Sequence, residues 1–145
     1  MDFPKNKSSE EIEQQFVKTF VISRLQDRAI YELASERKRE RFFSRLAHSH
    51  LLVLKQKLMT MIPRLRAEQE FDEIMRMLKI LGAGTYCYIM SDIQGLDRQI
   101  LHIEEGIYRC THCCMVAIMV CSDKLAFLQT ERVSASPPRF ILKAM

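Results

Sequence analysis

The fold is decided by the stretch Gly82–Glu131, which begins GAGTYCYIM (82–90), passes through a polar bridge to MVAIMVC (115–121), and closes with SDKLAFLQTE (122–131). β-Branched and aromatic residues in the first run, bounded by glycines, predict a strand from Thr85 onward. The second run is continuously apolar and of strand length, as expected for a central strand. The tripeptide SDK predicts a tight turn into a further strand over Leu125–Glu131. Together these signals indicate a small, mainly antiparallel sheet.

The segments around this stretch complete the C-terminal half. Residues 92–99 have the composition of a loop, and Ile103–Cys110 is predicted to be a short helix, because acidic residues at its start suit the positive end of a helix dipole. After a loop over Ser134–Pro138, the run Arg139–Lys143 predicts a last strand at an edge of the sheet.

Helical periodicity dominates the N-terminal half. Ser8 and Glu11 form a capping-box pattern, and the apolar stripe that follows predicts one helix over Ser9–Leu33. A later helix is predicted from about Arg66 or Ala67 to Leu81, where Gly82 or Gly84 supplies the left-handed residue that ends many helices.

Between these two helices lies a second one whose end the sequence leaves open. Ser35 can cap its start. The helix ends near Ala47–His50 or continues until Pro63, because the residue before a proline is pushed out of the helical region.

The order of elements, helices first and strands afterwards, favours the α+β class. We expect about three N-terminal helices packed on a small C-terminal, mainly antiparallel sheet, in a single domain over residues 1–145. Within it, residues 1–7 are expected to be flexible, 8–81 to form the helical part and 82–145 the sheet part.

The composition is that of a folded protein without a membrane-spanning segment. The chain has 145 residues, of which 48% are hydrophobic and 28% charged, values that fit a folded domain with its own core. It has no apolar run of about 18 residues and begins with charged residues in place of an apolar leader, so we expect a cytoplasmic protein without a membrane partner. Five cysteines cannot all pair within one chain, which suits a reducing compartment.

Several short segments of this chain resemble a group of small uncharacterised bacterial proteins. The likeness covers about the last 60 residues and a piece of the second helix. It is carried by Cys87–Asp92, Leu96–Asp97, Glu104–Glu105, Leu125–Phe127 and Arg139–Leu142, with Arg45–Leu46 and His48. The resemblance supports the element boundaries and implies no activity. The chain departs from the group at Cys110–Cys114, where glycines are expected, so the cysteine cluster is peculiar to this sequence.

That cluster is the sharpest local feature. It consists of Cys110, His112, Cys113 and Cys114, and the spacing of Cys110 and Cys113 is that of a zinc knuckle. A tetrahedral zinc site usually needs a second knuckle, and the sequence has no other C-x-x-C motif. The preferred interpretation is therefore structural cysteines, with a zinc site as the alternative. A redox dithiol is less favoured, because such a motif belongs at a strand-to-helix turn.

A basic stretch over residues 36–66 is the second feature. It contains nine Lys or Arg residues and two Glu residues, a formal net charge of +7. Such residues can contact phosphates without reading a base sequence. The candidates for nucleic-acid contact are Arg37, Lys38, Arg39, Arg41 and Arg45. The competing interpretation, which we prefer, is a solvated helix face.

We therefore expect a small non-enzymatic domain, without a cofactor, that binds a partner protein or associates with itself. The large apolar fraction, including exposed-looking Phe and Met residues, suggests more apolar surface than one core needs. The methionines are most simply core residues, and an adaptable binding groove is the alternative. A nucleic-acid-binding accessory protein and a zinc- or thiol-dependent site stay open as further alternatives.

Overall fold

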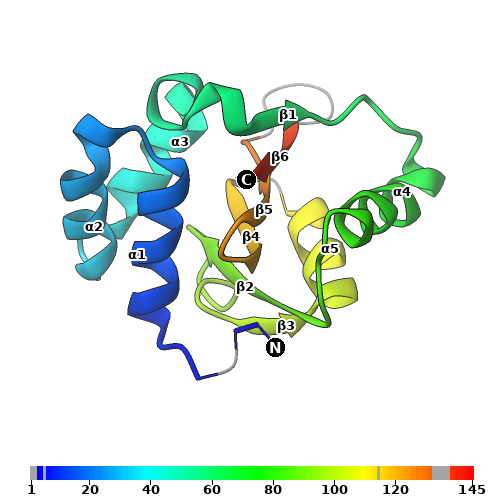
Figure 1. Cartoon of the computed structure of the whole chain (residues 1–145), viewed down its shortest axis with the longest axis horizontal. Helices are drawn as coiled ribbons and strands as arrows, with labels where there is room; N and C mark the ends of the chain where they lie inside the picture. Colours follow the sequence, from blue (N-terminus) through cyan, green and yellow to red (C-terminus); the bar gives the residue numbers. More distant parts are fainter. Residues whose placement is uncertain (1–2, 5, 114, 132–137) are drawn as a thin grey trace.

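The computed structural model describes residues 3–4, 6–113, 115–131 and 138–145, and these form three layers (Figure 1). A six-stranded antiparallel sheet is covered on one face by helices from the first third of the chain and on the other by two later helices. The predicted α+β class, with N-terminal helices packed on a C-terminal antiparallel sheet, is confirmed. Cys114 and most of the predicted loop Ser134–Pro138 lie outside the described residues.

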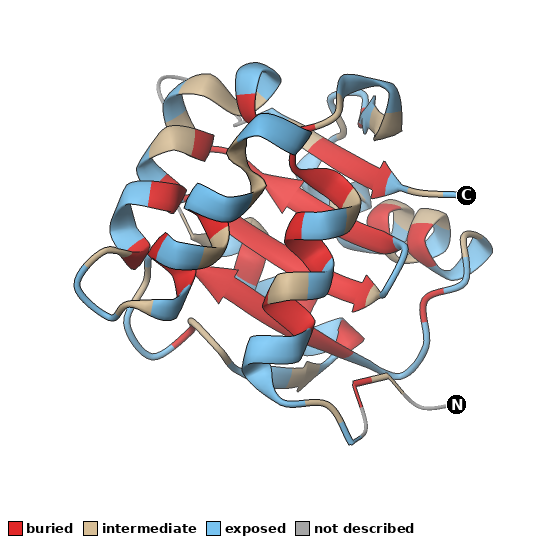
Figure 2. Cartoon of the chain, turned by 60° about the vertical axis from the view of Figure 1, so that its left-hand side comes forward, coloured by how far each residue is buried: buried red, intermediate tan, exposed pale blue. Residues whose placement is uncertain are grey.

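The sheet has the spatial order β1-β6-β5-β4-β2-β3, and every neighbouring pair is antiparallel. Its strands are β1 (Met59–Met61), β2 (Tyr86–Ser91), β3 (Ile100–His102), β4 (Ala117–Ser122), β5 (Leu125–Gln129) and β6 (Arg139–Lys143). The apolar run at 115–121 does form an interior strand, β4. Alternate side chains of β2 enter different cores, Tyr88 on one face and Ile89 on the other. Figure 2 shows these central strands buried and the helices exposed on their outer sides.

The prediction of one helix over Ser9–Leu33 is wrong in one respect. The chain forms α1 (Ser9–Phe20), with the predicted capping box, and α2 (Gln26–Ala34), separated by a short 3₁₀ turn at Ser23–Leu25. The break has a tertiary cause: Val21 forms an isolated antiparallel bridge with Leu54, so the backbone here pairs across the fold and leaves the helical path.

Helix α3 (Arg39–Val53) completes this layer but begins four residues after the predicted cap at Ser35. Non-helical backbone at Ser49 kinks it. Continuation of this helix to Pro63, one of the two alternatives, is wrong. The chain turns through a 3₁₀ segment, Gln56–Leu58, and enters β1.

The other face is covered by α4 (Ala67–Ile80) and α5 (Ile103–His112), close to the predicted bounds of both helices. Gly106 lets α5 lie near the sheet. A Cβ atom at this position would stand 2.5 Å from Sγ of Cys87 and 2.8 Å from Sδ of Met119.

Both edge strands are only three residues long. The prediction that Arg139–Lys143 forms an edge is wrong, because β1 pairs with β6 and takes the outer position (Figure 1). The predicted division into a helical part, 8–81, and a sheet part, 82–145, does not separate all strands from the helices, because β1 lies within residues 8–81. Among the described residues, no helix combines the length and apolar composition needed to cross a bilayer.

Candidate functional site

A buried arginine ties three separate elements together. Arg39, at the start of α3, is 5% exposed. Its two Nη atoms donate to the two carboxylate oxygens of Glu13 on α1, at 2.7 and 2.8 Å. Its Nε and Nη2 donate to the carboxylate of Asp97, in the loop between β2 and β3, at 2.9 and 2.8 Å. Bidentate pairs of this kind fix orientation as well as charge.

Tyr88 and Ser91 of β2 complete this network. The hydroxyl of Tyr88 donates to Oε2 of Glu13 at 2.6 Å, and the Ser91 N–H donates to Oδ1 of Asp97 at 3.0 Å. Burial, followed by the hydrogen bond to Glu13, raises the pKa of Tyr88, so the phenol stays protonated and acts as a donor. Burial opposes the charge on Arg39, yet its bonds to Glu13 and Asp97 raise the pKa of the guanidinium overall.

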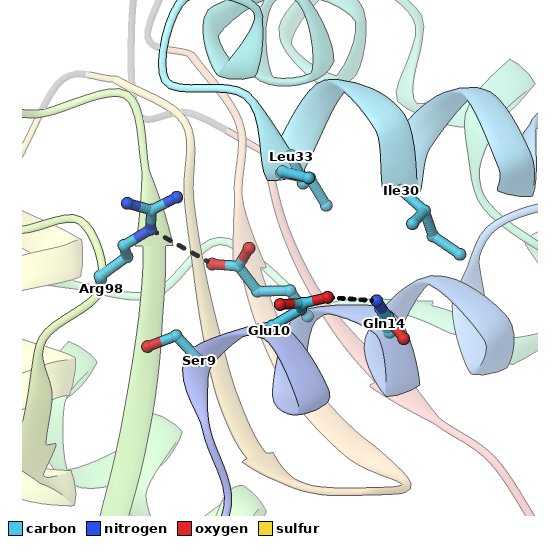
Figure 3. A pocket seen from close by; sticks show the side chains of 8 residues that line it. Ser9, Glu10, Gln14, Ile30, Leu33 and Arg98 are labelled. Carbon is cyan, nitrogen blue, oxygen red and sulfur yellow. Dashed lines mark hydrogen bonds and ion pairs between the residues drawn. The ribbon is translucent and has the colours of Figure 1, made fainter.

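Two hollows flank this network, and Arg98 lines both of them. One, of about 260 Å³, lies between α1 and α2 (Figure 3). The other, of about 410 Å³, lies over the β2–β3 loop and contains Asp92, whose pKa is raised by burial and then by Glu40 and Asp97. Nε of Arg98 is 4.0 Å from Oε2 of Glu13. The network thus forms a rigid floor between two solvent-facing cavities.

The five residues predicted to contact nucleic acid do not form one surface. Arg39 is buried and bonded to Glu13 and Asp97. Arg45 donates to Glu32 at 2.6 Å, and Glu32 is only 2% exposed. Lys38 is bonded to the hydroxyl of Tyr31. Arg37 and Arg41 are the exposed members of the set.

The cysteine cluster is also divided by the fold. Cys110, a residue of α5, is fully buried, and the Sγ of Cys113 donates to the carbonyl oxygen of Cys110 at 3.2 Å. The ring of His112 is exposed and stacks on Tyr108, with ring centroids 4.2 Å apart. In the part of the chain that the structure describes, no three potential ligands converge as a metal site requires. Cys114 lies outside that part, so the zinc alternative stays a prediction.

Three thiols gather between α5 and the sheet. Cys87, Cys110 and Cys121 are buried and form no disulfide. Burial raises the pKa of Cys87 to about 12 and raises the pKa values of Cys110 and Cys121 as well. Since the thiolate is the reactive form, these side chains are suited to packing and poorly suited to nucleophilic or redox chemistry.

Among the described residues no strand pairs with the outer side of β1, and this edge of the sheet is a feature that sequence reasoning missed. Ile62 N–H donates to the carbonyl oxygen of Arg139 at 2.8 Å, and Thr60 lies opposite Ile141. Because main-chain groups alternate in direction along an antiparallel ladder, those of Met61 point away from β6. The side chain of Met61 is 62% exposed.

Apolar side chains lie beside this edge, and the segment of chain that contains it is rich in cations. Met61 pairs with Phe140, whose ring packs against His50 of α3 at a centroid distance of 5.0 Å. The next two residues of α3, Leu51 and Leu52, are 51% and 65% exposed. The segment from 51 to 67 has four cations and no carboxylate; the cations are Lys55, Lys57, Arg64 and Arg66. Two of them have partners: Lys55 Nζ donates to the carbonyl oxygen of Lys18 at 3.4 Å, and Arg66 lies 3.9 Å from Glu68. The charge imbalance of the segment is the sequence signal that could have identified this surface.

A small hollow lies where β1 ends. It measures about 180 Å³ and is lined mainly by the chain from Met61 to Leu65, with Pro138 and Arg139 on the opposite side. Arg139 is held there by Glu70 of α4, at 2.8 Å. The edge strand therefore leads directly into a recess with apolar and cationic walls.

Comparison with protein-family models, with curated proteins and with solved structures finds no match for this chain.

Proposed function

We propose that this chain is a non-enzymatic protein-interaction domain that binds an extended, acidic segment of a partner protein along β1. The observation that carries the proposal is the outer edge of β1 at Met61, which pairs with no described strand and lies in a segment with two exposed leucines and four cations. We place the domain in the cytoplasm, without a membrane partner, because its buried thiols suit a reducing compartment.

Main-chain hydrogen bonds between β1 and the bound segment supply the affinity. An added strand places one residue opposite Met61 and exchanges two hydrogen bonds with it, as happens when peptides extend a sheet at its edge. Edge strands that are not used for binding are commonly protected by short length, charged side chains, bulges, prolines or covering segments, and β1, at three residues, has the first of these protections. Within β1 the sequence Met-Thr-Met contains no proline and no charge.

Side chains supply the specificity. Leu51, Leu52 and Met61 offer an apolar contact area, and methionine adapts to differently shaped partners. The hollow after Met61 can receive one side chain of the added segment. The cations of this segment favour a partner that carries carboxylates. Their attraction raises the rate of association, and the same cations repel basic competitors.

The same charges argue against a second copy of this chain as the occupant. Two β1 edges brought together would place Lys55, Lys57, Arg64 and Arg66 of one chain against the same four cations of the other. Self-association, if it occurs, would then use another surface. An acidic partner is the complementary choice.

A peptide selection tests this proposal. The full chain is offered a random peptide library, and the affinities of the selected peptides are measured by fluorescence anisotropy. We expect acidic peptides with an apolar residue at every second position. Reversing Lys55 and Lys57 together (K55E, K57E) should weaken binding about tenfold, or about 1.4 kcal/mol, whereas Lys124→Glu, at the β4–β5 turn, should not.

Three results would count against it. The first is selection of uncharged or basic peptides, and the second is unchanged affinity in the doubly reversed variant. The third is tighter binding to mixed RNA or to anionic lipid vesicles than to any selected peptide. RNA binding that falls steeply with salt would instead support the nucleic-acid alternative.

A further inference from the structure

The hollow between α1 and α2 lies at the opposite end of α1 from the β1 edge (Figures 1 and 3). It measures about 260 Å³. Its volume is slightly below the range of about 300–1,000 Å³ that holds drug-sized ligands. At about 30 Å³ for each water-sized group, it has room for roughly nine such groups. A ligand that fits it is a small metabolite.

One wall of this hollow is apolar and fixed. Figure 3 shows Ile30 and Leu33 pointing from α2 toward α1, and Ala34 lines the cavity beside them. The floor is the carboxylate of Glu13, whose side chain is 7% exposed and is held by Arg39 and Tyr88. Because both of its oxygens are already engaged, Glu13 shapes the cavity and leaves ligand binding to the groups at its rim.

Two rim groups carry opposite charges. Glu10, in the first turn of α1, accepts a hydrogen bond from Nε2 of Gln14 at 3.1 Å, and among the described residues no ion pair reaches it. Arg98 stands at the other end with a side chain 35% exposed. Its close partner Glu36 is 77% exposed, so water already competes for that pair.

We infer that this hollow binds a small zwitterion with an aliphatic body. The ammonium group of the ligand pairs with Glu10, its carboxylate pairs with Arg98, and its carbon chain lies against Ile30 and Leu33. Charge-assisted hydrogen bonds at both ends fix the orientation, and the apolar wall contributes burial. This inference is independent of the proposed partner at β1, because no residue lines both sites.

Calorimetric titration of the full chain tests it with a graded set of probes. Leucine, 5-aminopentanoate and 6-aminohexanoate sample different separations of the two charges, and pentylamine and pentanoate carry one charge each. We expect one zwitterion to bind at least about tenfold more tightly than either singly charged probe. Glu10→Gln should reduce its affinity about tenfold, since a charge-assisted bond is lost.

Two further variants make the result decisive. Ala34→Leu adds bulk to the wall and should abolish binding while leaving the melting temperature close to that of the unmodified chain, because Ala34 is exposed. Glu105→Gln, an equivalent change in the first turn of α5, should bind normally. Equal affinity for pentylamine and the best zwitterion, absence of binding by all three zwitterions, or unchanged affinity in both Glu10→Gln and Ala34→Leu would overturn the inference.

Discussion

Arg39 and Glu13, 26 residues apart in sequence, face each other in a buried bidentate ion pair at 2.7 and 2.8 Å. The pair joins the first turn of α3 to α1, and Asp97 extends it to the loop after β2. It fixes how the helical layer sits on the sheet, and it forms the floor of the hollow between α1 and α2.

Removal of the arginine should therefore destabilise the whole domain. Arg39→Met leaves the Glu13 carboxylate buried without its cation, a change that typically costs about 3–5 kcal/mol. Urea unfolding followed by circular dichroism measures the loss. Arg37→Ala, two residues away and exposed, is the control and should change the free energy of unfolding by less than about 0.5 kcal/mol. A cost below about 1 kcal/mol for Arg39→Met would show that the pair contributes little.

The close approach of α5 to the sheet gives a second prediction. Gly106→Ala should destabilise by about 1–3 kcal/mol, because the new Cβ would overlap Sγ of Cys87 and Sδ of Met119. The double variant Gly106→Ala, Cys87→Ala should recover part of this loss, which a double-mutant cycle measures. Gly84→Ala is the control, since apart from the adjoining residues no atom lies within 4 Å of its added Cβ. An unchanged free energy of unfolding in Gly106→Ala would mean that α5 lies farther from the sheet.

The pH dependence of stability should depend on His50. Burial lowers the pKa of its imidazole below 6.5, although a hydrogen bond with the backbone of Leu46 opposes this. The unfolded chain then binds the proton more readily, so stability present above pH 6.5 is lost as the pH falls through the lowered folded-state pKa. Melting temperatures at pH 7.5 and pH 5 should diverge less in His50→Leu than in the unmodified chain.

The control for this prediction is His48→Gln, because the side chain of His48 is 72% exposed. It should retain the pH dependence of the unmodified chain. If His48→Gln reduced that dependence and His50→Leu did not, the assignment to His50 would be wrong.

The thiols under α5 should be inert while the domain is folded. Burial raises the pKa values of Cys87, Cys110 and Cys121, so little thiolate forms at pH 8. Brief treatment with iodoacetamide, read by mass spectrometry, should label these three sites only after denaturation. Rapid labelling of Cys110 in the native protein would revive the thiol-dependent alternative. Elemental analysis of the same preparation tests the zinc alternative, which a near-stoichiometric metal content would support.

The parts of the fold that the sequence predicts are those with local signals. The helical apolar period of α4 and the apolar runs of β2 and β4 extend over several residues and indicate the element without knowledge of its neighbours. The three-residue strands β1 and β3 are too short to show a period. The break at Val21 depends on Leu54, 33 positions later, which no local pattern reveals.

The candidate sites were harder to predict, for a related reason. Within its basic run, Arg39 looks like a surface cation, and it becomes a buried one only because Glu13 and Asp97 converge on it from distant segments. Met61 looks like a core residue or part of a helix, and it becomes an exposed edge only because β6 pairs with the other side of β1. Contacts between distant segments decide both outcomes.

The most direct test of the central claim is the affinity of a selected acidic peptide for Met61→Pro, compared with Met61→Thr. The N–H of Met61 points away from β6 and donates to no described residue, so proline removes a donor that an added strand would use. Met61→Thr changes the side chain and keeps the donor. If a strand adds at β1, Met61→Pro should bind at least about tenfold more weakly than Met61→Thr, with similar melting temperatures. Equal affinities for the two variants would contradict strand addition at β1.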